Sequence, residues 1–250
     1  FNKMSEDIVS QRKQLAISEK HEAWSDVARK IAHEIKNPLT PIKLSIDRLK
    51  NKKNKGINIS ESEVIDTIDT INRQVDDIKN LVDEFSNFAR MPAPNMHEHN
   101  MKNIIDNAVS LFDRESNKIF IDLNRESLNF SVKCDESQIN RVFNNLIINS
   151  IHSIESKFKN KSGGRIYIDG SVEGKYLKIK IFDNGQGLTH KEEDILKPYF
   201  STKDKNIGTG LGLSIVEKII SEHEGNFHIY NIDDESGACS EFTLRLHNEW

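Results

Sequence analysis

A histidine, a carboxylate, a carboxamide and a hydroxyl lie close together near the start of the sequence. They belong to His33, Glu34, Asn37 and Thr40. On a helix with 3.6 residues per turn, His33, Asn37 and Thr40 fall on one face. An imidazole that a neighbouring group orients is a good nucleophile or base near neutral pH. Taken alone, however, an exposed histidine is more often ordinary solvated surface.

A second polar pair, Asn145 and Asn149, falls on one face of a later helical pattern because the two residues are four apart. Amide oxygens suit a hard cation such as Mg²⁺, which proteins usually share with phosphate oxygens. The pair alone is a weak indication, since asparagines also occupy positions 140 and 144.

Two glycine-rich stretches follow. Residues 183–187 read DNGQG at the end of a predicted strand. On its own this is a turn, but Asp183 could also accept a hydrogen bond from an adenine amino group. Residues 208–213 read GTGLGL and open a helix, where alternate glycines let backbone N–H groups approach phosphates. The spacing matches neither a P-loop nor a Rossmann fingerprint. The segment 184–209 has the length of a lid.

The histidine group lies on a segment with the pattern of a long amphipathic helix. Its apolar residues form one stripe on the side opposite His33. Pro38 and Pro41 lie inside the pattern, and each frees a carbonyl oxygen that a continuous helix would hydrogen bond. A run of lysines and Gly56 end this helix. The stripe consists of Trp24, Val27, Ala28, Ile31, Ile35, Leu39, Ile42, Ile46 and Leu49.

A second helix is predicted directly after the first, because Ser60 and Glu63 form a capping box. Two helices alone bury a single seam poorly. We therefore predict a homodimer in which two helical hairpins form a four-helix bundle. The alternative is an antiparallel pair that packs on the second half of the chain. The apolar positions of the second helix are Val64, Ile68, Ile71, Val75, Ile78, Val82, Phe85 and Phe88.

The second half of the chain alternates helices and strands after the segment Met91-Pro92-Ala93-Pro94, whose two prolines favour an extended linker. This alternation predicts an α/β sandwich with one helical layer. The helices are expected over 103–112, 135–158 and 211–224. The strands are expected over 118–123, 130–134, 165–172, 176–182, 227–231 and 240–246. The strands 165–172 and 176–182 are expected to form a hairpin around Glu173-Gly174.

Composition excludes several classes of protein. The chain has 250 residues, of which 36% are hydrophobic and 30% charged, and its formal net charge is −4. This composition is too apolar for a disordered chain, and the acidic balance argues against general nucleic-acid binding. Two cysteines, Cys134 and Cys239, can form neither a disulfide framework nor a zinc site, so we expect buried thiols. No apolar run approaches the roughly 18 residues of a membrane span, so this segment is not expected to cross a membrane.

In this order, the motifs resemble those of the sensor histidine kinases of two-component signalling. The segment HEIKNPLTPIKLS is similar to the H box around a phosphoaccepting histidine, and NNLIINS to the N box. DNGQG and GTGLGL resemble the two glycine boxes, and PYFSTK resembles the F box. The resemblance covers residues from about 20 to 247. The second proline of the H box looks most like the NtrY-type kinases of nitrogen regulation.

The resemblance implies a role for each matched residue. His33 would attack the γ-phosphate of ATP and become phosphohistidine, Glu34 would orient or deprotonate it, and Asn37 would align water for dephosphorylation of the partner. Asn149 would hold Mg²⁺, and Asp183 would read adenine. The residues implied in ATP binding are Asn145, Asn149, His152, Asp183, Gly185, Gly187, Phe200, Thr202, Lys203, Gly208, Thr209, Gly210, Leu211 and Gly212.

The fold class that follows is α+β: a helical hairpin that forms a dimeric four-helix bundle, then an α/β sandwich ATP-binding domain of the GHKL or Bergerat type. We expect a signal-transmitting helix at 1–20, a dimerisation and phosphotransfer domain at 21–90, a hinge linker at 91–97 and the catalytic domain at 98–250. The expected cofactors are ATP and Mg²⁺. The expected partners are a second copy and a response regulator receiver domain, of the nitrogen-regulation type if the NtrY likeness holds. The chain would be a cytoplasmic segment of a bacterial inner-membrane sensor.

Three residues depart from the family pattern, namely Ser150, Lys197 and Tyr199, which replace a common Ala, an acidic residue and a common Phe. None of them removes an expected ligand. Two rival interpretations stay open: a non-catalytic dimerisation scaffold, and a GHKL-type ATPase of another family. The scaffold predicts eroded nucleotide ligands, whereas the other ATPase families have no phosphoaccepting helix like the segment 33–40.

Overall fold

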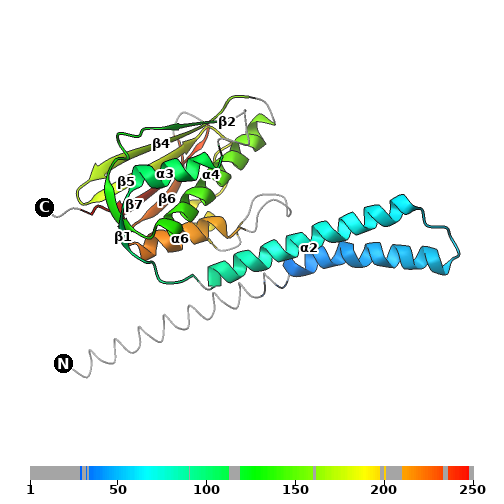
Figure 1. Cartoon of the computed structure of the whole chain (residues 1–250). Helices are drawn as coiled ribbons and strands as arrows, with labels where there is room; N and C mark the ends of the chain where they lie inside the picture. The colour runs from blue at the N-terminus through cyan, green and yellow to red at the C-terminus, as the bar shows by residue number, and fades with distance from the viewer. Residues whose placement is uncertain are drawn as a thin grey trace, which may run out of the picture. The chain divides into compact units, whose positions relative to one another are not determined.

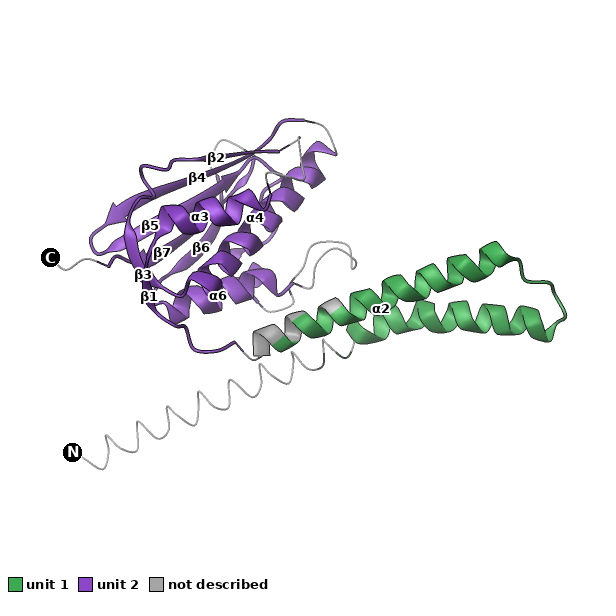
Figure 2. Cartoon of the chain, in the orientation of Figure 1, with its two compact units in different colours: residues 1–90 green, residues 91–250 purple. Residues whose placement is uncertain are grey.

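A computed structural model describes residues 29, 32, 34–89, 91–112, 119–159, 162–197, 200, 210–232 and 236–247. The chain divides into two compact units, Phe1–Arg90 and Met91–Trp250 (Figure 2). None of the helices in the described ranges is both long enough and apolar enough to cross a membrane.

Unit 1 is a helical hairpin. Residues 34–54 are helical through both Pro38 and Pro41, and helix α2 covers Glu61–Ala89. The predicted capping box is present, because the Ser60 hydroxyl oxygen accepts the N–H of Glu63 at 3.3 Å. The Lys52 ammonium pairs with the Glu63 carboxylate between the two helices. This ion pair holds the pKa of Glu63 below its ordinary value.

The apolar stripes of unit 1 remain partly open to solvent within one chain. Among the stripe residues that the structure describes, six are 37–50% exposed, and others, such as Ile42 and Ile78, are half-buried. A single hairpin therefore leaves much of its apolar surface uncovered. The six exposed residues are Leu39, Ile46, Val64, Ile68, Val75 and Val82.

Unit 2 is a mixed sheet with one layer of helices, as the sequence predicts. The five-stranded sheet has the order β2-β4-β5-β7-β6, in which only β2 and β4 are parallel. Helices α3, α4 and α6 cover one face of it (Figure 1). The strands are β1 (His97–Asn100), β2 (Ile119–Leu123), β3 (Ser131–Cys134), β4 (Gly164–Glu173), β5 (Tyr176–Asp183), β6 (Phe227–Asn231) and β7 (Ala238–Arg245). The helices are α3 (Met101–Ser110), α4 (Glu136–Phe158), α5 (Glu192–Ile195) and α6 (Gly212–Glu222).

The core lies between the sheet and the helices. Alternate residues of β5 are buried because successive side chains of a strand point to opposite faces. The rings of Phe143 on α4 and Phe242 on β7 meet edge to face at 5.6 Å. Cys134 and Cys239 are both buried free thiols, as predicted. Burial and the nearby acidic residues raise the pKa of Cys134 to about 12.

The sequence did not predict β1 or α5. Strand β1 consists of His97, Glu98, His99 and Asn100, and it forms a two-stranded antiparallel sheet with β3. Four polar residues carry no apolar alternation, so periodicity could not find this strand. Helix α5 has only four residues, too few to show a helical period.

Candidate functional site

The predicted phosphoacceptor residues belong to the first helix of unit 1. Glu34 lies on that helix and is half-buried, whereas Asn37, three residues later, is exposed. The Thr40 hydroxyl donates to the carbonyl oxygen of Lys36 at 3.1 Å, a bond within its own helix. His33 itself lies outside the described residues. Of the three expected catalytic residues, the structure thus describes two, Glu34 and Asn37, on one helix.

Asp183 ends β5 and is 7% exposed. Its Oδ1 accepts the N–H of Gly185 at 2.9 Å, and its Oδ2 accepts the hydroxyl of Ser150 on α4 at 3.3 Å. Burial raises the pKa of the Asp183 carboxyl, and the hydrogen bonds from Gly185, Ser150 and Ser153 oppose that rise. A buried carboxylate at the end of a strand is an acceptor aimed at a fixed position, as recognition of an amino group requires.

The turn after Asp183 is packed so closely that two of its positions require glycine. A Cβ on Gly185 would lie 2.2 Å from Ser153 Oγ and 2.7 Å from the Ser153 main-chain carbon. Gly187 has a φ of +76°, and a Cβ there would lie 2.8 Å from Asn231 Oδ1. Both predicted glycines of this box therefore let the turn lie directly against α4 and the end of β6.

Helix α4 lies against the turn after Asp183, and its caps set where the helix begins and ends. The Asp135 side chain caps it by accepting the N–H groups of Ser137 and Gln138, and Lys159 ends it in the left-handed conformation. Asn145 donates through Nδ2 to the carbonyl oxygen of Arg141 at 2.8 Å. The carboxamide oxygen of Asn145, Oδ1, is the hydrogen-bond acceptor of this side chain.

The start of α6 meets the asparagine pair. A Cβ on Gly212 would lie 2.9 Å from Asn145 Oδ1 and 3.8 Å from Asn149 Nδ2. Gly210 has a φ of +69°, and Leu211 is buried. The N-terminal turn of α6, a place where main-chain N–H groups favour anions, thus lies against the two carboxamides.

Other predicted site residues are placed less closely. His152 is half-buried on α4, seven residues after Asn145. The half-buried ring of Phe200 meets the edge of His190 at 5.1 Å between ring centroids. Four predicted ATP-binding residues lie outside the described residues, namely Thr202, Lys203, Gly208 and Thr209.

Sequence reasoning missed a contact at the end of β6. The Oδ1 atom of Asn231 accepts the N–H of Leu188 at 2.6 Å, and its Nδ2 atom donates to the Leu188 carbonyl oxygen at 3.0 Å. This pair of bonds fixes the residue after Gly187. Asn231 carries no local signal, because a single asparagine at the end of a strand fits many structures equally well.

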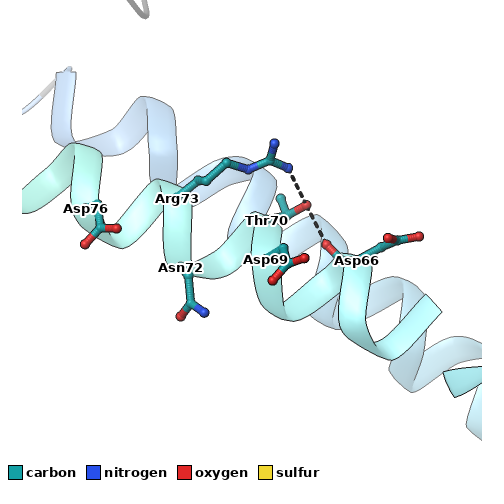
Figure 3. Close-up of a pocket in the computed structure, with 6 residues that line it drawn as sticks. All are labelled: Asp66, Asp69, Thr70, Asn72, Arg73 and Asp76. Atoms are coloured by element: carbon teal, nitrogen blue, oxygen red, sulfur yellow. Dashed lines mark hydrogen bonds between the residues drawn. The ribbon is translucent and has the colours of Figure 1, made fainter. Parts of the chain in front are cut away.

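The described part of the chain also has a surface pocket of about 560 Å³ on α2 (Figure 3). Arg73 donates to the Thr70 hydroxyl at 3.4 Å, and that hydroxyl donates to the carbonyl oxygen of Asp66 at 2.8 Å. All of the residues that line the pocket are polar or charged, and its carboxylates would repel phosphate. The lining residues are Asp66, Asp69, Thr70, Asn72, Arg73 and Asp76.

Comparison with known proteins gives two family matches. Residues 23–94 match the His Kinase A (phospho-acceptor) domain. Residues 134–249 match the histidine kinase-, DNA gyrase B- and HSP90-like ATPase. The first match includes position 33, and the second covers the asparagine pair, Asp183 and the start of α6.

Curated relatives resemble the chain along nearly its whole length. It is 39% identical over 235 residues to the nitrogen regulation protein NtrY of Azorhizobium caulinodans, which covers 93% of this chain and 30% of NtrY. It is 37% identical over 247 residues to a putative sensor histidine kinase NtrY-like of Rickettsia bellii, covering 98% of this chain and 39% of that protein. The chain thus spans well under half of the length of these relatives.

Solved structures share the fold. The histidine kinase ThkA, in a crystal structure in complex with the response regulator protein TrrA, aligns with a TM-score of 0.65 at 24% identity, over 88% of this chain and 61% of that one. The catalytic domain of ThkA alone aligns with a TM-score of 0.50 at 26% identity, over 60% of this chain and 97% of that one.

Fold and site together define an ATPase domain of the type shared by histidine kinases, gyrase B and HSP90, preceded by a phosphoacceptor helical unit. The chain belongs to the sensor histidine kinases, and its NtrY likeness agrees with the form of its H box.

Proposed function

We propose that this chain is the kinase core of a sensor protein, which binds Mg²⁺ and ATP in unit 2 and transfers the γ-phosphoryl group to His33. The observation that carries the proposal is the convergence of three elements of unit 2. The buried acceptor Asp183, the carboxamides of Asn145 and Asn149, and the start of α6 at Gly212 all meet on α4. This convergence occurs in a chain that also matches a phosphoacceptor domain.

Asp183 would recognise adenine by accepting a hydrogen bond from its amino group. The carboxylate is buried and already held by Ser150 and Gly185, so it needs little reorganisation on binding. Guanine presents a carbonyl oxygen at the corresponding position, and that oxygen would face the carboxylate without a proton between them.

The asparagine pair would hold Mg²⁺ together with phosphate oxygens. Two carboxamides form a weak site by themselves, and Mg²⁺ normally completes its octahedral shell with phosphates and water. The oxygen of Asn145 faces Gly212 and its nitrogen is bonded within the helix, so the oxygen is oriented for this role. The ion supplies neutralisation of charge on the phosphates when it is bound.

The transfer step forms a bond from an imidazole nitrogen of His33 to the γ-phosphorus and breaks the bond to the β,γ-bridging oxygen, which leaves on ADP. Glu34 accepts the proton of the imidazole. The phosphohistidine then gives its phosphoryl group to an aspartate carboxylate of a response regulator receiver domain. Asn37, exposed one turn after Glu34, would align a water molecule that hydrolyses the phosphoaspartate of the regulator and releases inorganic phosphate.

Two copies of the chain would assemble through unit 1, because its stripes leave six apolar residues 37–50% exposed. A four-helix bundle would bury them. Residues 1–20 would transmit the signal into the bundle and residues 21–90 would form the phosphotransfer domain. The whole protein would be a bacterial inner-membrane sensor with this segment in the cytoplasm and a nitrogen-regulation type of regulator as partner. The likeness to the nitrogen regulation protein NtrY supports this choice of regulator.

The experiment is incubation of the 250-residue chain with γ-³²P-labelled ATP and Mg²⁺. We expect acid-labile, alkali-stable label on the wild type and none on His33→Ala, with equal nucleotide binding by both. Label retained by His33→Ala would exclude the proposal that the chain phosphorylates itself at His33. Release of free phosphate without labelled protein would favour a GHKL-type ATPase of another family, and absence of ATP binding would favour a scaffold.

A further inference from the structure

The segment that joins the two units is held at two points by the beginning of α4. The main-chain N–H of Asn95 donates to Asp135 Oδ2 at 2.9 Å. The side-chain amide of Gln138 donates through Nε2 to the carbonyl oxygen of Pro92 at 3.1 Å. The sequence predicts a hinge at 91–97, yet position 97 already belongs to β1. Residues 92–95 are therefore attached to unit 2 although they form no helix or strand.

Packing alone does not explain why a glutamine occupies the buried position 138. It is 6% exposed, and among the described residues its Oε1 atom has no hydrogen-bond partner. A buried carbonyl oxygen without a partner destabilises the folded state. Methionine has the same length and would fill this position without that penalty. What the glutamine adds is the bond from Nε2 to Pro92.

Asp135, which holds Asn95 of the linker, is also hydrogen bonded to the end of helix α6. Its main-chain N–H donates at 3.0 Å to Nε2 of His223, which is 2% exposed at the C-terminus of α6. The His223 Nδ1 atom lies 2.7 Å from the carbonyl oxygen of Ile219, so Nδ1 carries the proton. The helices that meet at Asp135, α4 and α6, also carry Asn145 and Gly212. The linker thus attaches to the two helices that build the nucleotide site.

We infer that Gln138 is a positioning residue for phosphoryl transfer, which with Asp135 anchors residues 92–95 so that the two units pivot only before Pro92. The inference rests on the proposed function. Loss of the Gln138 bond to Pro92 would lengthen the free tether from about one residue to about four, because Asn95 stays bonded to Asp135. Since effective concentration falls roughly as the −3/2 power of tether length, we expect the rate of transfer to fall about five- to tenfold.

The test is the initial rate of His33 phosphorylation against ATP concentration in the 250-residue chain, for wild type, Gln138→Met and Asn95→Pro. Gln138→Met removes the bond to Pro92 together with the orphaned oxygen, and Asn95→Pro removes the N–H that Asp135 accepts. Ser137→Ala is the matched control, because it removes only the hydroxyl bond to Asp135 Oδ1 and keeps both bonds to the linker. Nucleotide affinity is measured in parallel with a fluorescent ATP analogue, and stability by thermal unfolding.

Gln138→Met should show the lower kcat with KM and nucleotide affinity within twofold of wild type, whereas Asn95→Pro keeps the bond at Pro92 and should keep the wild-type kcat. Gln138→Met should unfold at no lower temperature than wild type, and Ser137→Ala should keep the wild-type rate. An unchanged or higher kcat in Gln138→Met would overturn the inference, as would an equal loss in Asn95→Pro or a loss that follows weaker ATP affinity or a lower unfolding temperature. If the wild type itself takes up no phosphate, the proposed function is wrong. If the wild type is phosphorylated and Gln138→Met is phosphorylated at the same rate, only the inference about the linker is wrong.

Discussion

Replacing Asp183 with asparagine should separate the stability of unit 2 from its affinity for adenine nucleotides. An asparagine fits the same space. Its Oδ1 atom can accept the Gly185 N–H, and its Nδ2 atom can donate to the Ser150 hydroxyl oxygen, so these two contacts are kept although the second reverses its direction. The NH₂ group would, however, meet the amino group of adenine with a donor where an acceptor is needed.

The size of the effect follows from the bond that is lost. A hydrogen bond to a charged acceptor contributes about 1.5–3 kcal/mol. At about 1.4 kcal/mol per factor of ten, the Kd for ATP should rise about ten- to hundredfold. ADP should lose affinity by the same factor, since it shares the base. Ser150→Ala, which removes one bond to Asp183 and leaves the carboxylate in place, should lose much less.

Stability should respond in the opposite direction. Burial raises the pKa of Asp183 in the folded chain, so its ionised form carries a cost that is full above the raised pKa and is relieved as the pH falls through it. Asparagine has no such cost. The free energy of unfolding of Asp183→Asn relative to wild type should therefore rise with pH through that range and then level off.

Titration calorimetry with ATP and ADP, together with urea unfolding at several pH values, measures both effects. Wild-type affinity in Asp183→Asn would refute the assignment of this carboxylate to the base. Weaker binding together with a lower free energy of unfolding at neutral pH would refute the claim that the asparagine fits without strain.

Three further outcomes follow from the structure. Ile68→Asp, which places a charge on a residue 50% exposed in the single chain, should convert a dimer into a monomer in analytical ultracentrifugation, whereas the same change at the exposed and already polar Asn72 should not. Asp135→Ala should lower the free energy of unfolding by about 0.5–2 kcal/mol through loss of the α4 cap. Burial acts to raise the pKa of Asp135, but four donated hydrogen bonds hold it below its ordinary value. The stabilisation by this cap should therefore be present at neutral pH and be lost as the pH falls through the lowered pKa. Urea unfolding at a series of acid pH values would measure this loss. Asn231→Ala should raise the Kd for ATP and for ADP about equally in calorimetry, because it frees Leu188, while Asn226→Ala at the other end of β6 should leave both unchanged.

Apolar periodicity and turn residues in the sequence predicted most of the helices and strands. The capping box at Ser60, the helix α4 and the hairpin of β4 and β5 are all local features, whose apolar spacing or turn residues set their ends. The hairpin turns at Gly174, with Glu173 paired to Tyr176, where the sequence predicts the turn. The domain boundaries, the dimer and the roles of the site residues stay predictions.

The contacts that shape the site were not readable from the sequence. Ser153 is a plain helical serine until the fold brings Gly185 within contact of it, and Asn231 lies far along the chain from its partner Leu188. Gln138 belongs to a predicted helix, but its bond to Pro92 joins two segments with no shared pattern. Local propensity cannot encode such pairings, because they depend on tertiary structure.

The two thiols offer a way to time the opening of unit 2. Cys134 on β3 and Cys239 on β7 both have no exposed surface, and burial raises the pKa of each. A thiol reacts as the thiolate, so an alkylating reagent can modify these positions only when the surrounding sheet opens. The rate of alkylation, with and without nucleotide, would then report how strongly a bound ligand suppresses the opening of this sheet, without any introduced label.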